Sequence, residues 1–322
     1  MSNPDDPLPR TIAFVTLCGF YAGLAQRARG GAPRPLIVGR CGEVLEASRD
    51  LAFAGIRPGM SRREAAYAAP EALWVEYEPE LCLPAAEKLW QACASLTPRV
   101  EPVADHEVFL DLTGTVATPG FAALLRRALD LPDLAVCCGF ASSRLVARLA
   151  AERAVAQARP LPAGERDACL AIPPGGEASF LAPLPVSSLW TVPTAVRDTL
   201  VRLGLTTAGA VFSVPEEALY RLFGPEAFRL LRHARGEDAS PVPFFEAALA
   251  ARPSSGTVLR QAIDFSPGAG WPDLEASLRR ATQALAADLS ASGRSCLRLH
   301  FSLSEPGKAP QKTTLTPQDP PG

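Results

Sequence analysis

Lysine, histidine and long apolar runs are scarce in this sequence of 322 residues, and each scarcity excludes a class of protein. Lysine occurs only at Lys88, Lys308 and Lys312. No segment approaches the roughly 18 uninterrupted apolar residues that a membrane helix needs. The stretch 1–10 is polar and proline-rich, without the basic start and apolar core of a secretory signal. We therefore expect a cytoplasmic protein that has no membrane partner.

Metal-binding cysteine and histidine motifs are also missing. The 8 cysteines include no Cys-x-x-Cys pair, and the 3 histidines lie far apart in the chain. Zinc sites need such ligands at short, regular spacings. We expect no zinc site, and we expect the cysteines to be reduced and mostly buried.

Strong positive charge is absent, since the net charge is −2 and the isoelectric point is near 6.0. A protein that binds nucleic acid needs local clusters of arginine or lysine rather than a particular total charge. Any binding to DNA must therefore depend on local groups of arginines.

What is present is a pattern of short apolar runs that alternate with helical segments. The runs Thr11–Leu17, Val103–Leu112 and Ala135–Ala141 predict three strands. A helix is predicted over Gly19–Arg27, and another begins at Ser142 and continues past Arg153. This order predicts a mixed sheet covered by helices.

The rest of the chain divides into smaller pieces. A compact α/β insert follows the first helix, and within it Ser61 and Glu64 form a capping-box pattern for a helix Arg62–Ala69. Proline-rich and glycine-rich linkers are predicted at 160–176 and 241–255, on either side of short helices. The final part predicts a strand, a helix, a strand and a polar, proline-rich end, over Thr257–Phe265, Leu274–Leu289, Ser295–Leu303 and 305–322.

Several short motifs occur in a fixed order along the chain. They are Phe20-Tyr21-Ala22, Ala47-Ser48, 55–60 (GIRPGM), 107–114 (EVFLDLTG), 139–144 (GFASSR), 203–207 (LGLTT) and Phe223-Gly224. In order and spacing they resemble the Y-family translesion DNA polymerases over nearly the whole chain.

The resemblance implies a multidomain α/β and α+β fold. Its expected parts are a palm (1–30 and 75–160), fingers (31–74), a helical thumb (165–240), a linker (241–255) and a partial, truncated β-α-β little finger (256–322).

The resemblance also locates a metal site, where the family holds two divalent ions with three carboxylates. Aligned on Phe20-Tyr21, two of the acidic positions fall on Thr16 and Cys18. Aligned on Phe109-Leu110-Asp111, the family's Ser-Ile-Asp-Glu motif falls on 104–107, so that His106 and Glu107 occupy the ligand positions. Glu107 is the only matching acid. We expect no cofactor, and Mg²⁺ only where residual activity exists.

The expected nucleotide pocket is altered in the same way. The family's tyrosine and arginine that hold the triphosphate correspond to Arg49 and Ala52, and its later lysine falls near Val155. Only Arg49 could still bind a phosphate.

Candidate DNA contacts lie in two places. Ser142, Ser143 and Arg144 open a helix that also carries Arg148, where backbone N–H groups could hold a phosphate or the serines could act as an ordinary N-cap. Arg260 and Arg298 belong to a mildly basic segment of the partial little finger.

These losses predict a catalytically deficient DNA-repair protein that most resembles the ImuB-like branch of the family. The resemblance implies binding to damaged or primer-template DNA, the sliding clamp, an error-prone DnaE-type polymerase and a RecA-like accessory protein. Two alternatives stay open. One is an active polymerase that uses Asp105, Glu107 and Asp111 with an unusual metal geometry, and the other is a degenerate protein without a DNA function.

Overall fold

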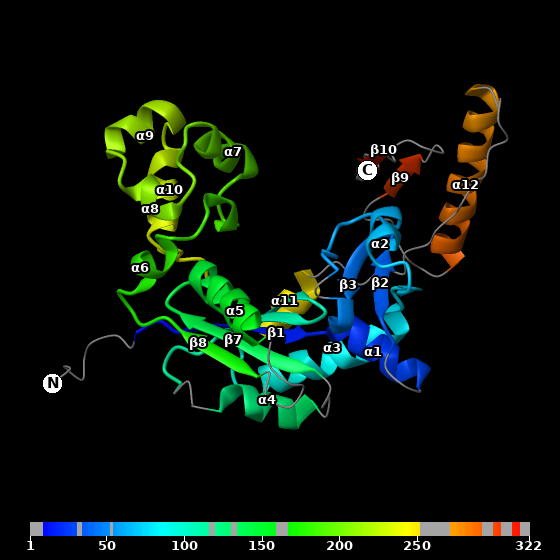
Figure 1. The fold of residues 1–322 in the computed structure, drawn as a ribbon, viewed down its shortest axis with the longest axis horizontal. Helices are drawn as coiled ribbons and strands as arrows, with labels where there is room; N and C mark the ends of the chain where they lie inside the picture. The colour runs from blue at the N-terminus through cyan, green and yellow to red at the C-terminus, as the bar shows by residue number, and fades with distance from the viewer. Residues whose placement is uncertain are drawn as a thin grey trace. The chain divides into compact units, whose positions relative to one another are not determined.

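The apolar segment Ile12–Cys18 forms strand β1 at the centre of a five-stranded sheet with the order β5-β6-β1-β7-β8 (Figure 1). Strands β6 and β7 pair with β1 in antiparallel fashion on its two sides, β5 is antiparallel to β6, and β8 is parallel to β7. The outer strands are β5 (Val100–Ala104), β6 (Glu107–Asp111), β7 (Ala135–Ala141) and β8 (Ala168–Ala171).

In this computed structural model the chain forms two units, Met1–Leu249 and Ala250–Gly322. The structure describes residues 9–30, 34–51, 54–115, 120–129, 134–158, 167–251, 271–291, 299–303 and 311–315. The sheet belongs to the first unit. Within the described residues, no helix is both long and apolar enough to cross a membrane.

The two faces of the sheet bury different cores, because successive side chains of a strand point to opposite sides. Ala13, Val15 and Leu17 pack into the core that also contains helices α1, α3 and α4. Ile12 and Phe14 pack against α5 and the short helices that follow it in the chain. The helices of the two cores include α1 (Phe20–Arg29), α3 (Pro79–Ala94), α4 (Phe121–Leu129) and α5 (Arg144–Ala158).

A second, three-stranded sheet with the order β3-β2-β4 is inserted between α1 and α3. Helix α2 (Arg62–Ala68) packs beside it and begins with a complete capping box, in which Ser61 and Glu64 bind each other's backbone N–H. The insert contains β2 (Leu36–Arg40), β3 (Glu43–Ala47), the 3-10 turn η1 (Arg49–Leu51) and β4 (Leu73–Glu76).

Short helices bounded by prolines follow β8, as the sequence predicts. They are α6 (Glu177–Leu181), the 3-10 turn η3 (Val186–Ser188), α7 (Thr194–Arg202), α8 (Ala208–Phe212), α9 (Glu216–Phe223), α10 (Glu226–Ala234) and α11 (Phe245–Ala251). The described part of the second unit has one helix, α12 (Trp271–Ala291), and an antiparallel pair, β9 (Leu299–Leu303) and β10 (Gln311–Leu315).

Four predictions from the sequence are wrong in detail. The segment 103–112 is a tight hairpin of β5 and β6 rather than one strand, with its turn at Asp105 and His106. The first expected linker contains β8, the second contains α11, and the polar end of the chain contributes β10. The predicted strand Thr257–Phe265 lies outside the described residues.

Candidate functional site

Thr16 and Glu107 lie opposite each other where β1 ends and the β5–β6 hairpin begins. Directly paired residues of antiparallel strands point to the same face, and Cys18, two residues beyond Thr16, shares that face. The N–H of Leu17 donates to the carbonyl oxygen of His106 at 3.0 Å, which fixes the hairpin against the end of β1. The structure therefore brings Thr16, Cys18 and Glu107 to one region of the sheet, as the sequence predicts.

His106 lies in the turn of the hairpin beside aromatic rings. Its imidazole stacks on Phe20 with 5.8 Å between ring centroids and meets Tyr21 edge-on. Burial lowers the pKa of the imidazole, because desolvation disfavours its charged form. His106 therefore acts as a neutral, packed ring and supplies no positive charge to Glu107 near neutral pH.

Glu107 already has a cationic neighbour, Arg148 on α5. A terminal guanidinium nitrogen of Arg148 lies 3.6 Å from Oε2 of Glu107, and its Nε lies 3.3 Å from Oε1 of Glu152. The same guanidinium lies over the rings of Phe14 and Trp190, at 5.4 and 5.5 Å from their centroids. The charge of Glu107 is thus offset by an internal cation that aromatic rings hold in place.

Asp105 takes part in a different cluster. Its Oδ2 accepts hydrogen bonds from the hydroxyls of Tyr77 at 2.8 Å and Tyr21 at 3.4 Å, and the residue is 9% exposed. Burial, with the nearby Asp105 carboxylate, raises the pKa of both tyrosines, so their hydroxyls remain donors. Asp105 lies in the turn between β5 and β6 rather than within a strand. The turn and the two tyrosines hold it instead.

Asp111 is also remote from Glu107. Asp111 pairs with Ile12 and Glu107 pairs with Thr16, so the two acids lie at opposite ends of β1 and β6. Four residues of extended strand span about 13 Å, which is too far for two ligands of one metal ion.

The residues at this site do not fit a pair of magnesium ions. Mg²⁺ prefers hard oxygen ligands, mainly carboxylates. Thr16 is neutral, Cys18 is a thiol, and a dication beside Glu107 would be repelled by Arg148. Among the described residues, no three His, Cys, Asp or Glu side chains are grouped as metal ligands would be.

A second anionic group, Glu46 on β3, occupies the amino end of α1. The N–H of Ala22 donates to its Oε2 at 2.9 Å, and the N–H groups of Gly19, Phe20 and Tyr21 also stabilise the carboxylate. Gly19 adopts a left-handed conformation with φ of 75° and has no side chain to cap the helix. A carboxylate from another sheet therefore caps α1 where helices commonly bind anions.

Burial raises the pKa of Glu46 to about 7, although the backbone N–H groups oppose this shift. Arg49, the expected phosphate ligand, lies three residues beyond Glu46 and is exposed on η1. Val155, at the position of the family's lysine, lies on α5 and carries no charge. The site thus combines the Glu46 carboxylate at the amino end of α1 with Arg148, whose guanidinium pairs with Glu107.

Comparison with known proteins shows which sequences the chain resembles. Residues 17–152 match the sequence model of the impB/mucB/samB family. The chain is 31% identical over 243 residues to a DNA polymerase IV of Dehalococcoides mccartyi, covering 72% of this chain and 60% of that protein. A DNA polymerase IV of Alkalilimnicola ehrlichii is 28% identical, over 72% of this chain and 66% of its own.

Solved structures agree on the fold. A Dbh ternary complex superposes with a TM-score of 0.59 at 20% identity, over 72% of this chain and 68% of its own. A Y-family DNA polymerase chimera, Dbh-Dpo4(243-245)-Dbh, superposes with a TM-score of 0.64 at 16% identity, over 95% and 87%. In sequence the chain is similar to the impB/mucB/samB family and to DNA polymerases IV, and in fold it is similar to the Y-family DNA polymerase structures. It spans about 60% of the length of the first curated relatives it matches.

The predicted DNA contacts just before α5 and on its first turns each have an internal partner in the structure. Ser142 donates to Oε1 of Glu177 at 2.5 Å, and Ser143 accepts the N–H of Val146 at 3.3 Å as an N-cap. A terminal guanidinium nitrogen of Arg144 lies 2.5 Å from Oε2 of Glu101, and the guanidinium carbon lies 4.6 Å from the ring centroid of Phe109. Arg148 is paired as described, and Arg260 and Arg298 lie outside the described residues. Their role in DNA binding stays a prediction.

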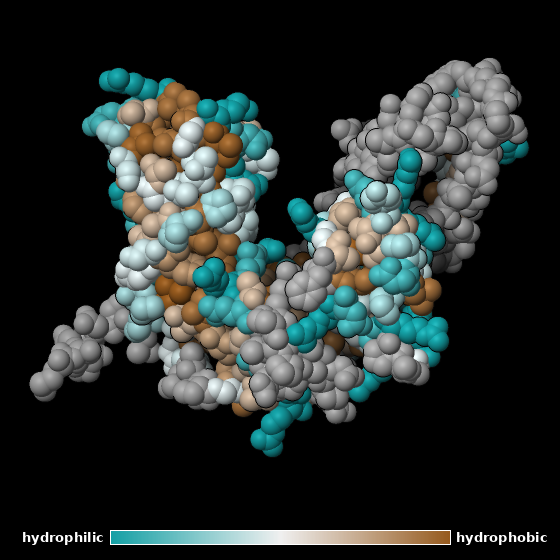
Figure 2. Space-filling model, in the orientation of Figure 1, coloured by the Kyte–Doolittle hydropathy of each residue, from teal (hydrophilic) through white to brown (hydrophobic). Residues whose placement is uncertain are grey.

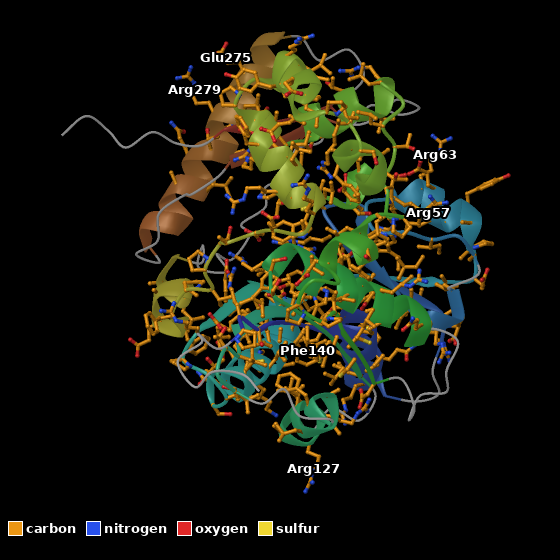
Figure 3. All side chains as sticks on the ribbon, turned by 90° about the vertical axis from the view of Figure 1, so that its left-hand side faces the viewer. Arg57, Arg63, Arg127, Phe140, Glu275 and Arg279 are labelled. Carbon is orange, nitrogen blue, oxygen red and sulfur yellow. The ribbon has the colours of Figure 1, made fainter. Side chains whose placement is uncertain are left out.

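Exposed arginines occur elsewhere on the chain. Arg57, Arg62 and Arg63 form a basic group around the start of α2, and Arg57 and Arg63 extend outward from it (Figure 3). Arg127 extends outward from α4 (Figure 3). The helices α7–α10 instead expose apolar side chains (Figure 2): Val201, Leu203, Tyr220, Leu222 and Phe228.

Reasoning from sequence missed Glu46 and Tyr77 as parts of this site, and it named Arg148 only as a candidate DNA contact. Glu46 alone carried a signal, because it is an acid directly before the Ala47-Ser48 step that the family resemblance places beside the nucleotide. The partners of Tyr77 and Arg148 become visible only when the hairpin, α5 and the inserted sheet are brought together.

Proposed function

We propose that this chain is a catalytically deficient relative of the Y-family polymerases that binds primer-template DNA and acts as an adaptor during the bypass of damaged bases. The observation that carries the proposal is the pairing of Glu107 with Arg148 beside the neutral Thr16 and the thiol of Cys18. An arrangement of this kind offers no carboxylate cluster that would hold two divalent ions.

The carboxylate of Glu46 supports the same proposal. It occupies the N–H groups at the start of α1, which a nucleotide phosphate would otherwise approach. The sliding clamp, an error-prone DnaE-type polymerase and a RecA-like protein are the partners we propose from the resemblance to the ImuB-like branch, together with a cytoplasmic location.

One observation favours a second candidate, an active polymerase. The curated relatives carry the name DNA polymerase IV, and one of them is 31% identical over 72% of this chain. Such an enzyme would need a metal geometry that the side chains around Glu107 do not offer.

Primer extension separates the two candidates. We expect the purified full chain to incorporate no nucleotide in magnesium or manganese, because Thr16, Cys18 and His106 supply no carboxylates. A matched reaction with a Y-family polymerase controls for the substrate. Templated incorporation that Glu107→Ala abolishes would refute the proposed deficiency.

DNA binding is tested by its dependence on salt. We expect measurable affinity for primer-template DNA at low salt. The affinity should fall as the salt concentration rises, because the counterions that binding releases then gain less entropy. The double variant Arg57→Ala/Arg63→Ala is expected to lower the slope of log K against log salt by about 1–2, since each phosphate contact contributes about 0.9. Arg127→Ala, at an exposed arginine on α4, is the control and should leave the slope unchanged. A wild-type chain without affinity at low salt would favour the degenerate protein.

A further inference from the structure

Two thiols meet at the end of β1 on the face that carries Glu107. Thr16 pairs with Cys137, and Cys18 pairs with Ala135, so Cys18 and Cys137 are diagonal neighbours on adjacent strands. Their side chains point to the same face of the sheet. Cys137 is the direct partner of Thr16, and Cys18 lies two residues beyond Thr16 on β1. Their sulfur atoms are 3.5 Å apart.

We propose that Cys18 and Cys137 form a reversible redox pair, which a hydroperoxide oxidises to a cross-strand disulfide. The inference does not depend on whether the chain extends a primer. It concerns a covalent bond between the adjacent strands β1 and β7, and it requires only that these two strands pair.

Access and position suit this reaction. Cys18 is partly exposed, and it is the last residue of β1, next to Gly19, where the chain leaves the sheet with φ of 75°. Cys137 is buried within β7. A disulfide needs the two sulfur atoms about 2 Å apart. The strand end at Cys18 can supply the remaining movement more easily than the centre of a strand, because backbone pairing stops there.

The surroundings of Cys137 favour its thiolate. Hydrogen bonds from the Cys18 thiol and from the N–H of Ala168 lower the pKa of Cys137, while burial opposes them. A thiolate is the form of cysteine that attacks an oxidant. The short distance between the two sulfur atoms and the lowered pKa of Cys137 therefore both favour a reaction between Cys18 and Cys137.

The proposed chemistry balances in two steps. The thiolate of one cysteine attacks a peroxide oxygen, so that an S–O bond forms, the O–O bond breaks, and water leaves with hydrogen peroxide as oxidant. The second thiolate then attacks the sulfenic sulfur, so that the S–S bond forms and hydroxide leaves as a second water after protonation. Two thiols are oxidised and one peroxide is reduced. A dithiol reductant reverses the product by thiol–disulfide exchange.

A second thiol pair on the opposite face serves as an internal comparison. Cys138 of β7 is the register partner of Cys169 on β8. Cys169 is exposed, and a hydrogen bond from Cys138 lowers its pKa to about 7. This thiol should react fastest with any added oxidant. Its oxidation must therefore be separated from that of Cys18 and Cys137.

The test uses the full-length Cys169→Ser protein treated with hydrogen peroxide, alkylated and digested with trypsin. We expect one new disulfide between the peptide 11–27, which contains Cys18, and the peptide 128–144, which contains Cys137 and Cys138. The cross-link should survive Cys138→Ser and disappear with Cys137→Ser. It should also disappear with Cys18→Ser.

Thermal unfolding of the Cys169→Ser protein, without the substitutions at Cys18, Cys137 or Cys138, gives an independent measurement. The cross-link closes a long loop, since the two cysteines are 119 positions apart. The oxidised protein should unfold about 5–10 °C above the reduced one, and a reductant should reverse the shift. The inference is overturned if Cys18 and Cys137 remain fully alkylatable after peroxide treatment, or if the cross-link persists in Cys137→Ser.

Discussion

Gly139→Ala is expected to lower the free energy of unfolding of the first unit by about 3 kcal/mol or more. Gly139 lies in the middle of β7, under α5. A Cβ atom at this position would lie 2.0 Å from the carbonyl oxygen of Ala147 and 2.3 Å from the backbone nitrogen of Ala151. Backbone atoms cannot rotate away as a side chain can, so α5 must move off the sheet. That movement would loosen the core around Phe14 and the Arg148–Glu107 pair.

Chemical or thermal denaturation of the purified variant measures this effect. The matched control is Gly42→Ala, in the turn between β2 and β3, where φ is 79° and no atom lies within 4 Å of the added Cβ. That substitution should cost about 1 kcal/mol, from the left-handed backbone alone. Equal losses in the two variants would show that α5 yields to the extra methyl group without cost.

The sequence predicted the central strands and their helices well, because each is defined by its own residues. The run of β-branched and aromatic residues in β1, the apolar segment of β7 and the capping box of α2 are local signals. The close approach at Gly139 was not predicted, although the small side chains of α5 opposite it are visible in the sequence.

The errors occurred where a distant partner decides the structure. No glycine or proline marks the turn at Asp105 and His106, so the pattern 103–112 looked like one continuous strand. Strand β8 forms because its residues pair with β7. A strand of four residues has little periodicity of its own. Similarly, β10 is a polar segment that gains its strand geometry from β9.

The candidate site was predicted in its positions but not in its charges. The family resemblance named Thr16, Cys18 and Glu107 as positions of one site, and the strand register puts them on one face. The Arg148–Glu107 and Glu46–Ala22 contacts join elements that are far apart in the sequence, and no local pattern encodes them. These two contacts nevertheless determine the electrostatics of the site, because each supplies the charge opposite to the group it meets.

Glu46→Gln is expected to remove a dependence of stability on pH. The pKa of Glu46 is raised from 4.5 to about 7 by burial, so the folded protein binds its proton more tightly than the unfolded chain does. The contribution of protonated Glu46 is therefore fully present below pH 4.5 and is lost as the pH rises through about 7. Glutamine keeps an oxygen acceptor for the N–H of Ala22 and carries no charge at any pH.

Relative to the wild type, Glu46→Gln should therefore gain about 2 kcal/mol of stability between pH 5 and pH 8, after allowance for the partial exposure of the residue. The ionisable neighbours Tyr21 and Cys82 have raised pKa values and stay neutral over this range, so they cancel in the comparison. Denaturant unfolding at both pH values measures the difference, with the exposed Glu71→Gln as control. A difference that does not change with pH would mean that the backbone N–H groups of α1 fully compensate the buried charge. Glu46 would then be an ordinary ionised helix cap, rather than a carboxylate that its burial keeps close to protonation.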